Sequence, residues 1–521
     1  MLSRARLIQR LVIFAIFSFL LFVGSQRIPL RSNTVPSAPS APSPARDSSY
    51  ERQVQFWKNL HNLLESNSPA TDPPERLKKA ENVLFDPNAN YTRPDLFAIS
   101  EGDVKQLQQV HQRVVQKIKN DNSSLELVYH RGKRGIVSAA GRKYLPTLVI
   151  SLRLLRRSGT RFPVEVFIAS QEQYDEVVCE QILPTMNAVC IVLSGILGTN
   201  VVSRLEPFQL KSFAMLFSSF EQLLWLDASC FPIHDAIEIF QSKPFTHVGL
   251  VTWPDFWSSD PSRFFNTIAS KPEPPVSERA STDGGQLLIS KKTHAKTLLL
   301  ASYYNYYGET HFYLLLSQSD VGGSDKETYL AAASVLDEPF YAVNEPIRSI
   351  GHRNANGHLD SSATVQYSPT EDYKLTNQGI NRVKDANAGP IPHAFFLRTS
   401  YSKMSPVNLF DPSRNGSEEV SPIRGPDGKP SRAWTAEKET IDSLGGPDVE
   451  REYWSHVRWT VCTLEGLQFK DWKDKEGTCQ QAKEYFDAYP FVFLETLPLS
   501  QYCQTTMSSR TAQKAVLSRD A

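Results

Sequence analysis

The 521-residue sequence lacks an excess of either charge, a metal-binding cysteine pattern and any evident internal repeat. Its 56 basic and 56 acidic residues give a formal net charge of +0. A general nucleic-acid-binding protein shows a basic excess, so we expect no nucleic-acid partner. None of the six cysteines has CxxC spacing, which argues against a zinc site. The 34 prolines and 11% aromatic residues suit a loop-rich globular enzyme better than a disordered chain.

The hydrophobic run near the N-terminus, residues 11–23, is short for a plasma-membrane span, which needs about 20 residues. With Gly24 and Ser25 it is long enough to cross a thinner bilayer. The basic residues before it predict a cytoplasmic N-terminus and a lumenal body. We therefore predict a cytoplasmic tail over 1–10, a signal anchor over 11–25 and a Pro/Ser-rich spacer over 26–50. The alternative is a cleaved signal peptide, because Val23 and Ser25 offer small residues for cleavage.

Two further features fit a lumenal, oxidising compartment. Three N-x-S/T glycosylation sites begin at Asn90, Asn122 and Asn415. Cys179 and Cys190 are close in sequence and flank a helix-like segment, so we predict a disulfide between them. Cys462 has two candidate partners, Cys479 and Cys503, and the sequence leaves that choice open.

The pattern of apolar residues predicts an α/β fold for the main body. Residues 51–130 are charged and helix-like, and we interpret them as a stem or N-terminal subdomain. Strand, helix and strand then follow at 135–141, 144–156 and 163–168, which is the order of a βαβ unit with a parallel sheet. We assign the catalytic domain to 131–507 and predict a disordered tail over 508–521.

Further elements follow along the same domain. Apolar spacing predicts helices over 207–220 and 293–307, and strands over 222–226, 245–253 and 285–290. Ser324 and Glu327 have the spacing of a capping box, with Ser324 as the N-cap of another helix.

Asp227, in the segment EQLLWLDASCFP, is the most informative residue. It follows a short apolar strand of the kind that is buried on both faces. Ligands of open α/β sheets bind beyond the carboxyl ends of the strands, and an acid there can hold a metal that neutralises a phosphate leaving group. The alternative is an ordinary aspartate at a strand-to-loop turn.

Other acids and histidines stand beside glycine or aromatic residues. They lie in the segments WPDFW (253–257), DGGQ (283–286) and GSDKE (323–327), and at His352 and His393. Transfer of a sugar from a nucleotide donor needs such groups: a metal at the diphosphate, acids near the anomeric carbon and aromatic walls. Each also has a structural alternative, such as stabilisation of a helix N-terminus by Asp325.

In this order, the segments resemble the fungal Golgi α-mannosyltransferases of the MNN1/MNN2 type, most closely their α-1,2-mannosyltransferase branch. The similar segments include GIVSAAGRKYLPTLVISLRLLRRSGTRFPVEVF, FQLKSFAMLFSSFEQLLWLDAS, VTWPDFW, DGGQLLISKKTH, LLASYYNYYG, GGSDKETYLAA and PHAFFLRTSYSKMSPVNLF. They cover about residues 135–410. The predicted anchor and spacer also suit that family.

The resemblance implies a GT-A type fold, a nucleotide-sugar-binding sheet with flanking helices. It implies a manganese-dependent, retaining glycosyltransferase that moves mannose from GDP-mannose to a mannose-terminated glycan, in mannan or in N- or O-glycans. By position, Asp227 and His393 are the expected metal ligands. Asp283, Asp325 and Glu327 are the expected catalytic acids. The expected donor-binding residues are Gly135, Val137, Lys211, Asp227, Trp253 and Asp255.

The sequence also departs from the family pattern. Ser229 stands where the second acid of the DxD motif is usual, and Asp283 stands where glutamate is usual. A neutral hydroxyl is a weaker ligand for a hard cation. Alternatives are therefore a non-catalytic homologue that scaffolds a glycosyltransferase complex, or a relative with α-1,3 linkage or another sugar nucleotide. For either reading we expect a single-pass type II protein of the Golgi membrane.

Overall fold

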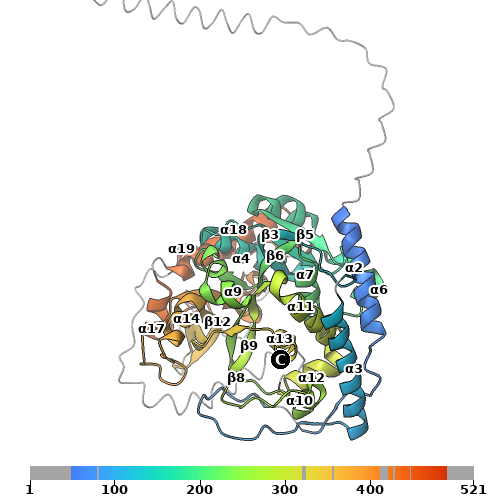
Figure 1. The fold of residues 1–521 in the computed structure, drawn as a ribbon. Helices are drawn as coiled ribbons and strands as arrows, with labels where there is room; N and C mark the ends of the chain where they lie inside the picture. The colour runs from blue at the N-terminus through green and yellow to red at the C-terminus, as the bar shows by residue number, and fades with distance from the viewer. Residues whose placement is uncertain are drawn as a thin grey trace, which may run out of the picture. The chain divides into compact units, whose positions relative to one another are not determined.

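The computed structural model describes residues 48–489, apart from 79–80, 122, 320–323, 355–356, 411–420, 426–428, 446–447 and 474 (Figure 1). The chain divides into two compact units, Met1–Asp47 and Ser48–Ala521, and only the second is described below. The predicted cytoplasmic tail, anchor and C-terminal tail, and the glycosylation sites at Asn122 and Asn415, lie outside the described residues. Asn90 is exposed. Within the described part, no helix has both the length and the apolar character to cross a membrane.

A seven-stranded sheet forms the centre of the second unit. Its order is β10-β8-β9-β6-β3-β4-β5, and β9 alone runs antiparallel to its neighbours. The strands are β3 (His130–Ala139), β4 (Val164–Ile168), β5 (Ala188–Val192), β6 (Phe220–Leu226), β8 (Leu250–Ser258), β9 (Ala280–Ser290) and β10 (Tyr341–Ala342). The predicted α/β fold and the parallel β3-α4-β4 unit are confirmed.

Both faces of this sheet are buried, because successive side chains of a strand point to opposite faces. In β3, Ile136 joins one hydrophobic core and Val137 the other. The Val137 face is covered by α2 (Ser48–Glu65), α3 (Glu101–Asn120), α7 (Pro207–Phe217), α11 (Lys291–Tyr306) and α13 (Thr328–Leu336). The Ile136 face is covered by α4 (Leu145–Arg157), α18 (Val449–Gly466) and α19 (Thr478–Asp487). The predicted stem helices thus share the core of the main body.

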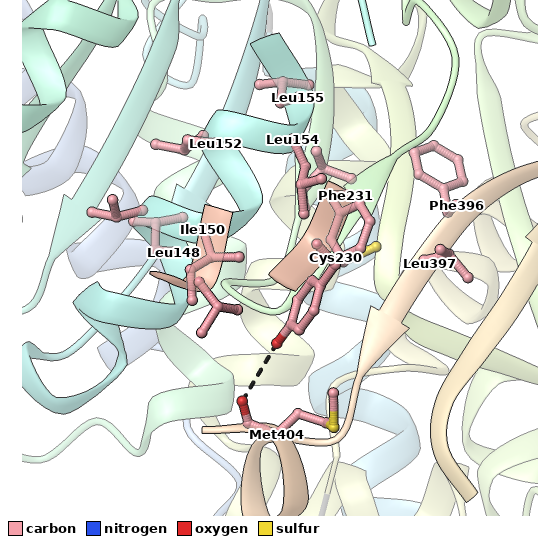
Figure 2. Close-up of a cluster of buried hydrophobic side chains, with 14 of the residues drawn as sticks. Leu148, Ile150, Leu152, Leu154, Leu155, Cys230, Phe231, Phe396, Leu397 and Met404 are labelled. Carbon is pink, nitrogen blue, oxygen red and sulfur yellow. Dashed lines mark hydrogen bonds between the residues drawn. The ribbon is translucent and has the colours of Figure 1, made fainter. Parts of the chain in front are cut away.

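A second, four-stranded antiparallel sheet lies beside the end of β6. Its order is β11-β12-β13-β7, formed by Arg348–Arg353, Leu359–Tyr367, Ala394–Thr399 and Cys230–Pro232. β7 follows β6 after a three-residue connection, and Arg398 of β13 pairs with Cys230 of β7. Phe231 and Phe396 of this sheet pack with leucines of α4 (Figure 2). The packing fixes β13 at the carboxyl end of β6.

Shorter helices complete the unit. They are α5 (Ser194–Leu197), α6 (Thr199–Val202), α8 (Ile237–Phe240), α9 (Lys243–Val248), α10 (Arg263–Ala269), α12 (Tyr313–Leu316), α14 (Pro369–Asn377), α15 (Tyr401–Met404), α16 (Pro406–Phe410) and α17 (Lys438–Ser443). A separate two-stranded ladder joins β1 (Glu75–Arg76) to β2 (Phe97–Ala98).

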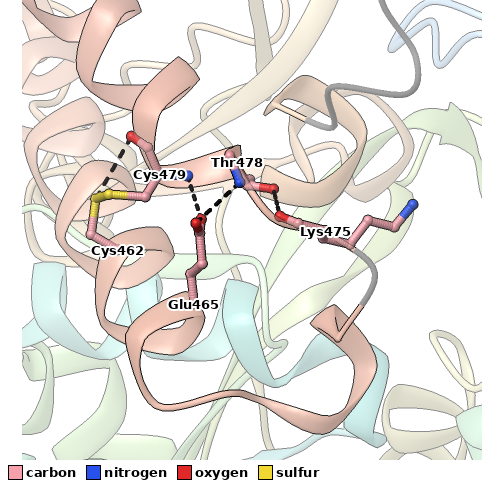
Figure 3. Close-up of a disulfide and its surroundings, with 6 residues drawn as sticks. Cys462, Glu465, Lys475, Thr478 and Cys479 are labelled. Carbon is pink, nitrogen blue, oxygen red and sulfur yellow. Dashed lines mark hydrogen bonds between the residues drawn. A yellow bond between two sulfur atoms is a disulfide. The ribbon is translucent and has the colours of Figure 1, made fainter.

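Among the residues that the structure describes, two disulfides are formed. The predicted Cys179–Cys190 pair is confirmed. Cys462 pairs with Cys479 and so joins α18 to α19, where Glu465 accepts hydrogen bonds from the backbone N–H groups of Gly477 and Cys479 (Figure 3).

Two local predictions are wrong. The expected strand over 245–253 begins with α9 instead, because Ser242 caps the Phe245 N–H and Gly249 ends the helix with a φ of 81°; β8 starts only at Leu250. The expected capping box is also absent: α13 starts at Thr328 after Glu327, which has no side-chain cap bond and turns its carboxylate to the Thr282 N–H.

Candidate active site

Asp227 lies directly after β6, where the sheet's parallel strands end. Its backbone N–H donates to the Gly285 carbonyl of β9 at 2.9 Å, which fixes the turn. The side chain accepts from Trp225 Nε1 at 2.9 Å through Oδ1 and pairs with Arg398 Nη2 at 3.0 Å through Oδ2. Both carboxylate oxygens therefore have donors, and 28% of the side chain stays exposed.

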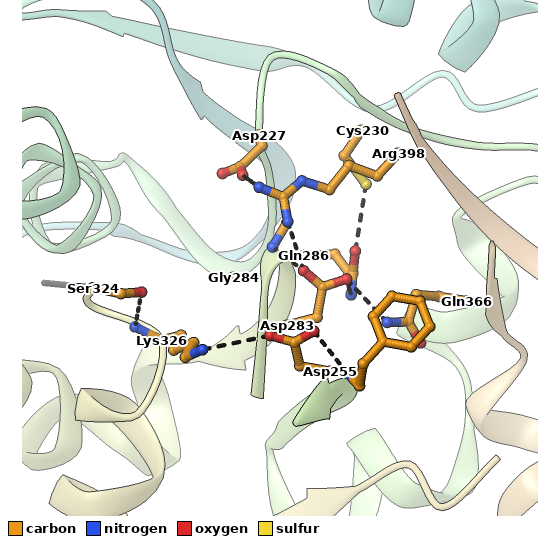
Figure 4. A network of polar contacts seen from close by, with 12 residues as sticks. Asp227, Cys230, Asp255, Asp283, Gly284, Gln286, Ser324, Lys326, Gln366 and Arg398 are labelled. Carbon is orange, nitrogen blue, oxygen red and sulfur yellow. Dashed lines mark hydrogen bonds and ion pairs between the residues drawn. The ribbon is translucent and has the colours of Figure 1, made fainter. Parts of the chain in front are cut away.

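Arg398, near the end of β13, links two of the acids. Its Nη2 reaches Asp227 and its Nη1 lies 2.9 Å from Asp283 Oδ1, so one guanidinium stands between two carboxylates (Figure 4). Burial opposes the charged form, but Asp227 and Asp283 outweigh it and raise the pKa of Arg398. The guanidinium fork fits such paired contacts and stays charged in proteins. The side chain is still 40% exposed, so a ligand can reach it.

Asp283, in β9, is the buried member of the site. Its Oδ1 accepts from the Gly285 N–H and from Arg398, both at 2.9 Å. Its Oδ2 accepts from Gln286 Nε2 at 3.2 Å and Gln366 Nε2 at 2.9 Å. Burial alone would raise the pKa of Asp283, but Arg398 and these hydrogen bonds hold it below its usual value. Asp283 is thus an ionised anchor for Arg398.

Gly285 makes room for this contact. A Cβ at this position would lie 2.7 Å from Arg398 Cδ, closer than real Cβ contacts come. The neighbouring Gly284 has no such restriction, since its Cβ would meet Lys211 Nζ at 3.7 Å. The second glycine of the DGGQ segment is therefore the one that Arg398 requires.

Two lysine–aspartate pairs flank the centre. Lys211 of α7 pairs with Asp325 at 3.1 Å and donates to the Gly284 carbonyl at 2.8 Å. Lys326 pairs with Asp255 of β8 at 3.4 Å. Burial raises the pKa of Asp325 and of Asp255, although the paired lysine opposes the shift in each case.

The site as a whole nearly balances its charge. Four carboxylates and three cations meet at the carboxyl end of β6: Asp227, Asp255, Asp283 and Asp325 with Lys211, Lys326 and Arg398. Among them Arg398, Asp227 and Asp255 are the most exposed, at 40%, 28% and 21%. These three side chains are the ones that an incoming ligand would touch first.

Other predicted site residues take no part in the ion pairs of this cluster. Glu327 is buried against Arg279 at 2.6 Å, and although burial opposes it, this pairing lowers the pKa of Glu327. Trp253 lies in the core, with its indole N–H donating to the Tyr367 carbonyl. Gly135 and Val137 lie inside β3, and a Cβ at Gly135 would meet the Phe220 ring at 2.1 Å.

His393, the expected second metal ligand, lies at the opposite end of β13 from Arg398. The two are five residues apart in an extended segment, and at about 3.3 Å per residue that is roughly 16 Å. Its Nδ1 lies 3.1 Å from Glu371 and its Nε2 lies 3.4 Å from Glu238. His393 and Asp227 thus do not share one metal site, because β13 separates them along its length.

The remaining acids do not replace that ligand. Among the described residues, no group of three or more histidine, cysteine, aspartate or glutamate side chains could hold a metal ion. Ser229 removes the acid expected next to Asp227, and Arg398 places a fixed positive charge against Asp227. The residues present therefore do not fit a manganese ion in this arrangement.

Sequence reasoning missed Arg398 and Gln366. Arg398 is the fifth residue of the strand AFFLRT and follows four buried residues, and a basic residue after such a run was the available signal. Gln366, in β12, carried no signal of its own, because its role depends on the pairing of β12 with β13.

Comparisons with known proteins agree with the sequence resemblance. A family model described as "Mannosyltransferase putative" matches residues 133–282 and 276–369. The α-1,2-mannosyltransferases MNN24 and MNN21 of Candida albicans are 32% and 33% identical, over 68% and 74% of this chain. The chain spans 58% and 66% of the length of these two relatives. The α-1,2-mannosyltransferase MNN5 of Saccharomyces cerevisiae is 26% identical, over 81% of this chain and 86% of its own length.

Solved structures show weaker likeness. The glycosyltransferase GlyE of Streptococcus pneumoniae has a TM-score of 0.26 at 14% identity, over 40% of this chain and 45% of its own. The galactosyltransferase LgtC with donor and acceptor analogues has a TM-score of 0.27 at 11% identity, over 40% and 73%.

Proposed function

Since the chain belongs to the same family as the fungal α-1,2-mannosyltransferases that it matches, we propose that it is a retaining α-1,2-mannosyltransferase. In this proposal a GT-A type domain moves mannose from GDP-mannose to the 2-hydroxyl of a terminal α-mannoside. The observation that carries it is the charged cluster of Asp227, Asp283 and Arg398 at the carboxyl end of β6. That edge is where open α/β sheets bind their ligands.

The proposed reaction exchanges one bond to the anomeric carbon for another. The bond from that carbon to the β-phosphate oxygen breaks, and GDP leaves with the electron pair. In same-face attack, the acceptor oxygen bonds to that carbon directly and its proton passes to the departing phosphate. In a two-step route, a carboxylate first bonds to the carbon as GDP leaves, and the acceptor oxygen then displaces that carboxylate while a second carboxylate takes the hydroxyl proton. Both routes retain the α configuration, and both develop negative charge on the leaving group that nearby donors can stabilise.

The described residues divide these tasks. Asp283 stays ionised and orients Arg398. Arg398 supplies positive charge at the exposed side of the site, next to Asp227, and Lys326 supplies a second, more buried charge next to Asp255. Asp255 is the acid best placed to meet the sugar or its hydroxyl proton, because it is partly exposed and burial raises its pKa.

The test uses the full chain in detergent with labelled GDP-mannose and an α-linked mannobiose, once with EDTA and once with manganese. We expect a trisaccharide whose new residue is released by an α-1,2-specific mannosidase and whose anomeric proton has α geometry. UDP-glucose and UDP-galactose serve as control donors, and Asp283→Asn as the inactive control. No product under either metal condition contradicts transferase activity, and resistance to the mannosidase points to the α-1,3 alternative.

Ser229 favours one second candidate, a non-catalytic homologue that acts within a glycosyltransferase complex. The Ser229→Asp variant separates the two. Activity in the wild-type chain supports the transferase, whereas activity that appears only in Ser229→Asp supports the non-catalytic alternative.

We further propose that the protein is a type II Golgi membrane protein with its catalytic domain in the lumen. The disulfides Cys179–Cys190 and Cys462–Cys479 support an oxidising compartment. Protease protection of sealed Golgi vesicles tests the topology: the body should resist digestion until detergent is added.

A further inference from the structure

The diphosphate of a sugar nucleotide carries a negative charge of about two, and the site must balance this charge. In the expected arrangement, Asp227 and a second acid hold a divalent cation for this purpose. Here Ser229 replaces the second acid, and both oxygens of Asp227 already accept from Trp225 and Arg398. Arg398 Nη2 lies 3.0 Å from Asp227 Oδ2, so a cation bound to that oxygen would lie close to the guanidinium and be repelled by its like charge.

Arg398 has what a fixed replacement for that cation requires. Asp283, which is only 4% exposed, fixes one side of the guanidinium at 2.9 Å, and Gly285 clears the path of the side chain. The 40% exposure leaves other N–H groups accessible to a ligand. Guanidinium forks match phosphate oxygens in pairs and do not lose their charge.

We propose that Arg398 takes the role of the metal ion in this chain, so that the diphosphate of the donor binds to Arg398 directly and without a divalent cation. This inference rests on the proposed function for the class of ligand. When the glycosidic phosphate bond breaks, the electron pair stays on the phosphate oxygen and Arg398 stabilises it. Lys326, paired with Asp255 beside it, adds a second positive charge.

Calorimetric titration of the full chain with GDP tests the proposal apart from catalysis. We expect the dissociation constant of the wild-type chain to agree within about twofold between EDTA and manganese chloride. Arg398→Gln removes the charge and should weaken binding about 10- to 100-fold in both conditions. Arg398→Lys keeps the charge but loses the guanidinium fork, so its affinity for GDP should lie between those of the wild-type chain and Arg398→Gln. Wild-type binding that requires manganese, or unchanged binding by Arg398→Gln, overturns the proposal.

A spectroscopic readout follows the metal itself. Manganese(II) gives an electron paramagnetic resonance signal that broadens when the ion is bound. In a mixture of wild-type chain, GDP and manganese, we expect the signal of manganese with GDP alone. An extra bound species that appears only with the protein contradicts the proposal.

Gly285→Ala keeps the test decisive if Arg398→Gln does not fold, because it displaces Arg398 without removing it. Its Cβ would sit 2.7 Å from Arg398 Cδ, whereas that of Gly284→Ala meets Lys211 Nζ at 3.7 Å. We expect a clearly larger loss of GDP affinity for Gly285→Ala, and equal affinities count against the proposal.

UDP and CDP, titrated in EDTA, separate this proposal from the proposed function. If one of them binds through Arg398 while GDP does not, the arginine role stands and the GDP-mannose donor is wrong. If none of the three binds in EDTA, the arginine role is wrong.

Discussion

The two ends of β13 hold similar charged clusters with different chemistry. At the carboxyl end, Arg398 lies between Asp227 and Asp283. At the other end, His393 lies between Glu238 and Glu371 and stacks edge-on against His234 with ring centroids 4.7 Å apart. In both cases one cation serves two carboxylates, but only arginine keeps its charge at every physiological pH.

The difference indicates which end is suited to a ligand. Arg398 is anchored on the buried Asp283 and the partly exposed Asp227, and it is the most exposed of the three, so its charge faces outward. His393 is anchored on two partly exposed glutamates, and its charge depends on pH. A phosphate-binding group must stay charged during turnover, whereas a surface cluster that only ties two elements together need not.

The largest expected effect is on catalysis, when Arg398 or His393 is replaced by glutamine. Arg398→Gln should lower kcat/KM for mannosyl transfer about 100-fold, the typical loss when a donor to the developing charge is removed. His393→Gln should stay within about twofold, because it lies at the far end of β13. Steady-state kinetics with GDP-mannose measures both. A comparable loss for His393→Gln would favour the metal-site prediction from the sequence.

The next largest effect is the difference in stability loss when each of the two acids that hold Arg398 is replaced by asparagine. Asp283→Asn should lower the free energy of unfolding by about 3 kcal/mol, since one amide N–H₂ must then face a donor in a buried site. Asp227→Asn should cost about 1 kcal/mol, because that side chain is 28% exposed and its Oδ1 can still accept from Trp225. Urea unfolding of both variants checks the order, and equal losses contradict it.

The third comparison, between alanine substitutions at Gly285 and Gly284, tests the packing against Arg398. Gly285→Ala should destabilise the fold by about 1–3 kcal/mol through overpacking. Gly284→Ala should change stability by no more than about 1 kcal/mol, since its new Cβ makes ordinary contacts. The thermal midpoints of the two variants measure this difference, and a reversed order would show that Arg398 gives way easily.

The two ends of β13 also show what sequence reasoning could reach. Asp227, Asp283, Lys211 and Asp325 were predicted as site residues, and the structure brings them together. Asp227 was singled out by its place after an apolar strand, and the roles of Asp283, Lys211 and Asp325 came from the resemblance. The role of His393 came from the same resemblance, but the structure places it at the other end of β13. Its position depends on how β13 pairs with β7, and that antiparallel register is not readable from one strand.

The apolar pattern of the sequence predicted secondary structure well where a strand is completely buried. It predicted poorly where helix-capping residues determine the secondary structure. The run Phe220–Leu226 is buried along nearly its whole length, and its apolar pattern was sufficient to predict the strand over 222–226, although the start of β6 at Phe220 was assigned to the preceding helix. The segment just before β8 was also predicted to be strand from residue 245, yet Ser242, Pro244 and Gly249 turn it into α9. Helix caps there outweighed the apolar pattern.

The smallest expected effect is a pH dependence that only the His393 end should show. Burial alone would lower the pKa of His393, but Glu238 and Glu371 outweigh it, so the folded-state pKa lies above the ordinary value. Its stabilising contribution is therefore complete below about pH 6.5 and is lost as the pH rises through the folded-state pKa. His234 shifts in the opposite direction, because burial and then His393 lower its pKa, and it offsets part of this gain in acid.

The measurement is the unfolding free energy of the wild-type chain minus that of His393→Gln at pH 5.5 and at pH 8. We expect the wild-type advantage to be larger at pH 5.5, by about 1 kcal/mol or less, because the histidine and its glutamates are partly exposed. Glu371→Gln is the matched control and should reduce the change of this difference between pH 5.5 and pH 8. The same difference for Arg398→Gln should be flat over this range, because Arg398 stays charged and the pKa of Asp283 is lowered. A pH dependence of this difference for Arg398→Gln, or none for His393→Gln, would contradict the distinction between a permanent and a titratable cation. The assignment of the ligand-binding end of β13 depends on that distinction.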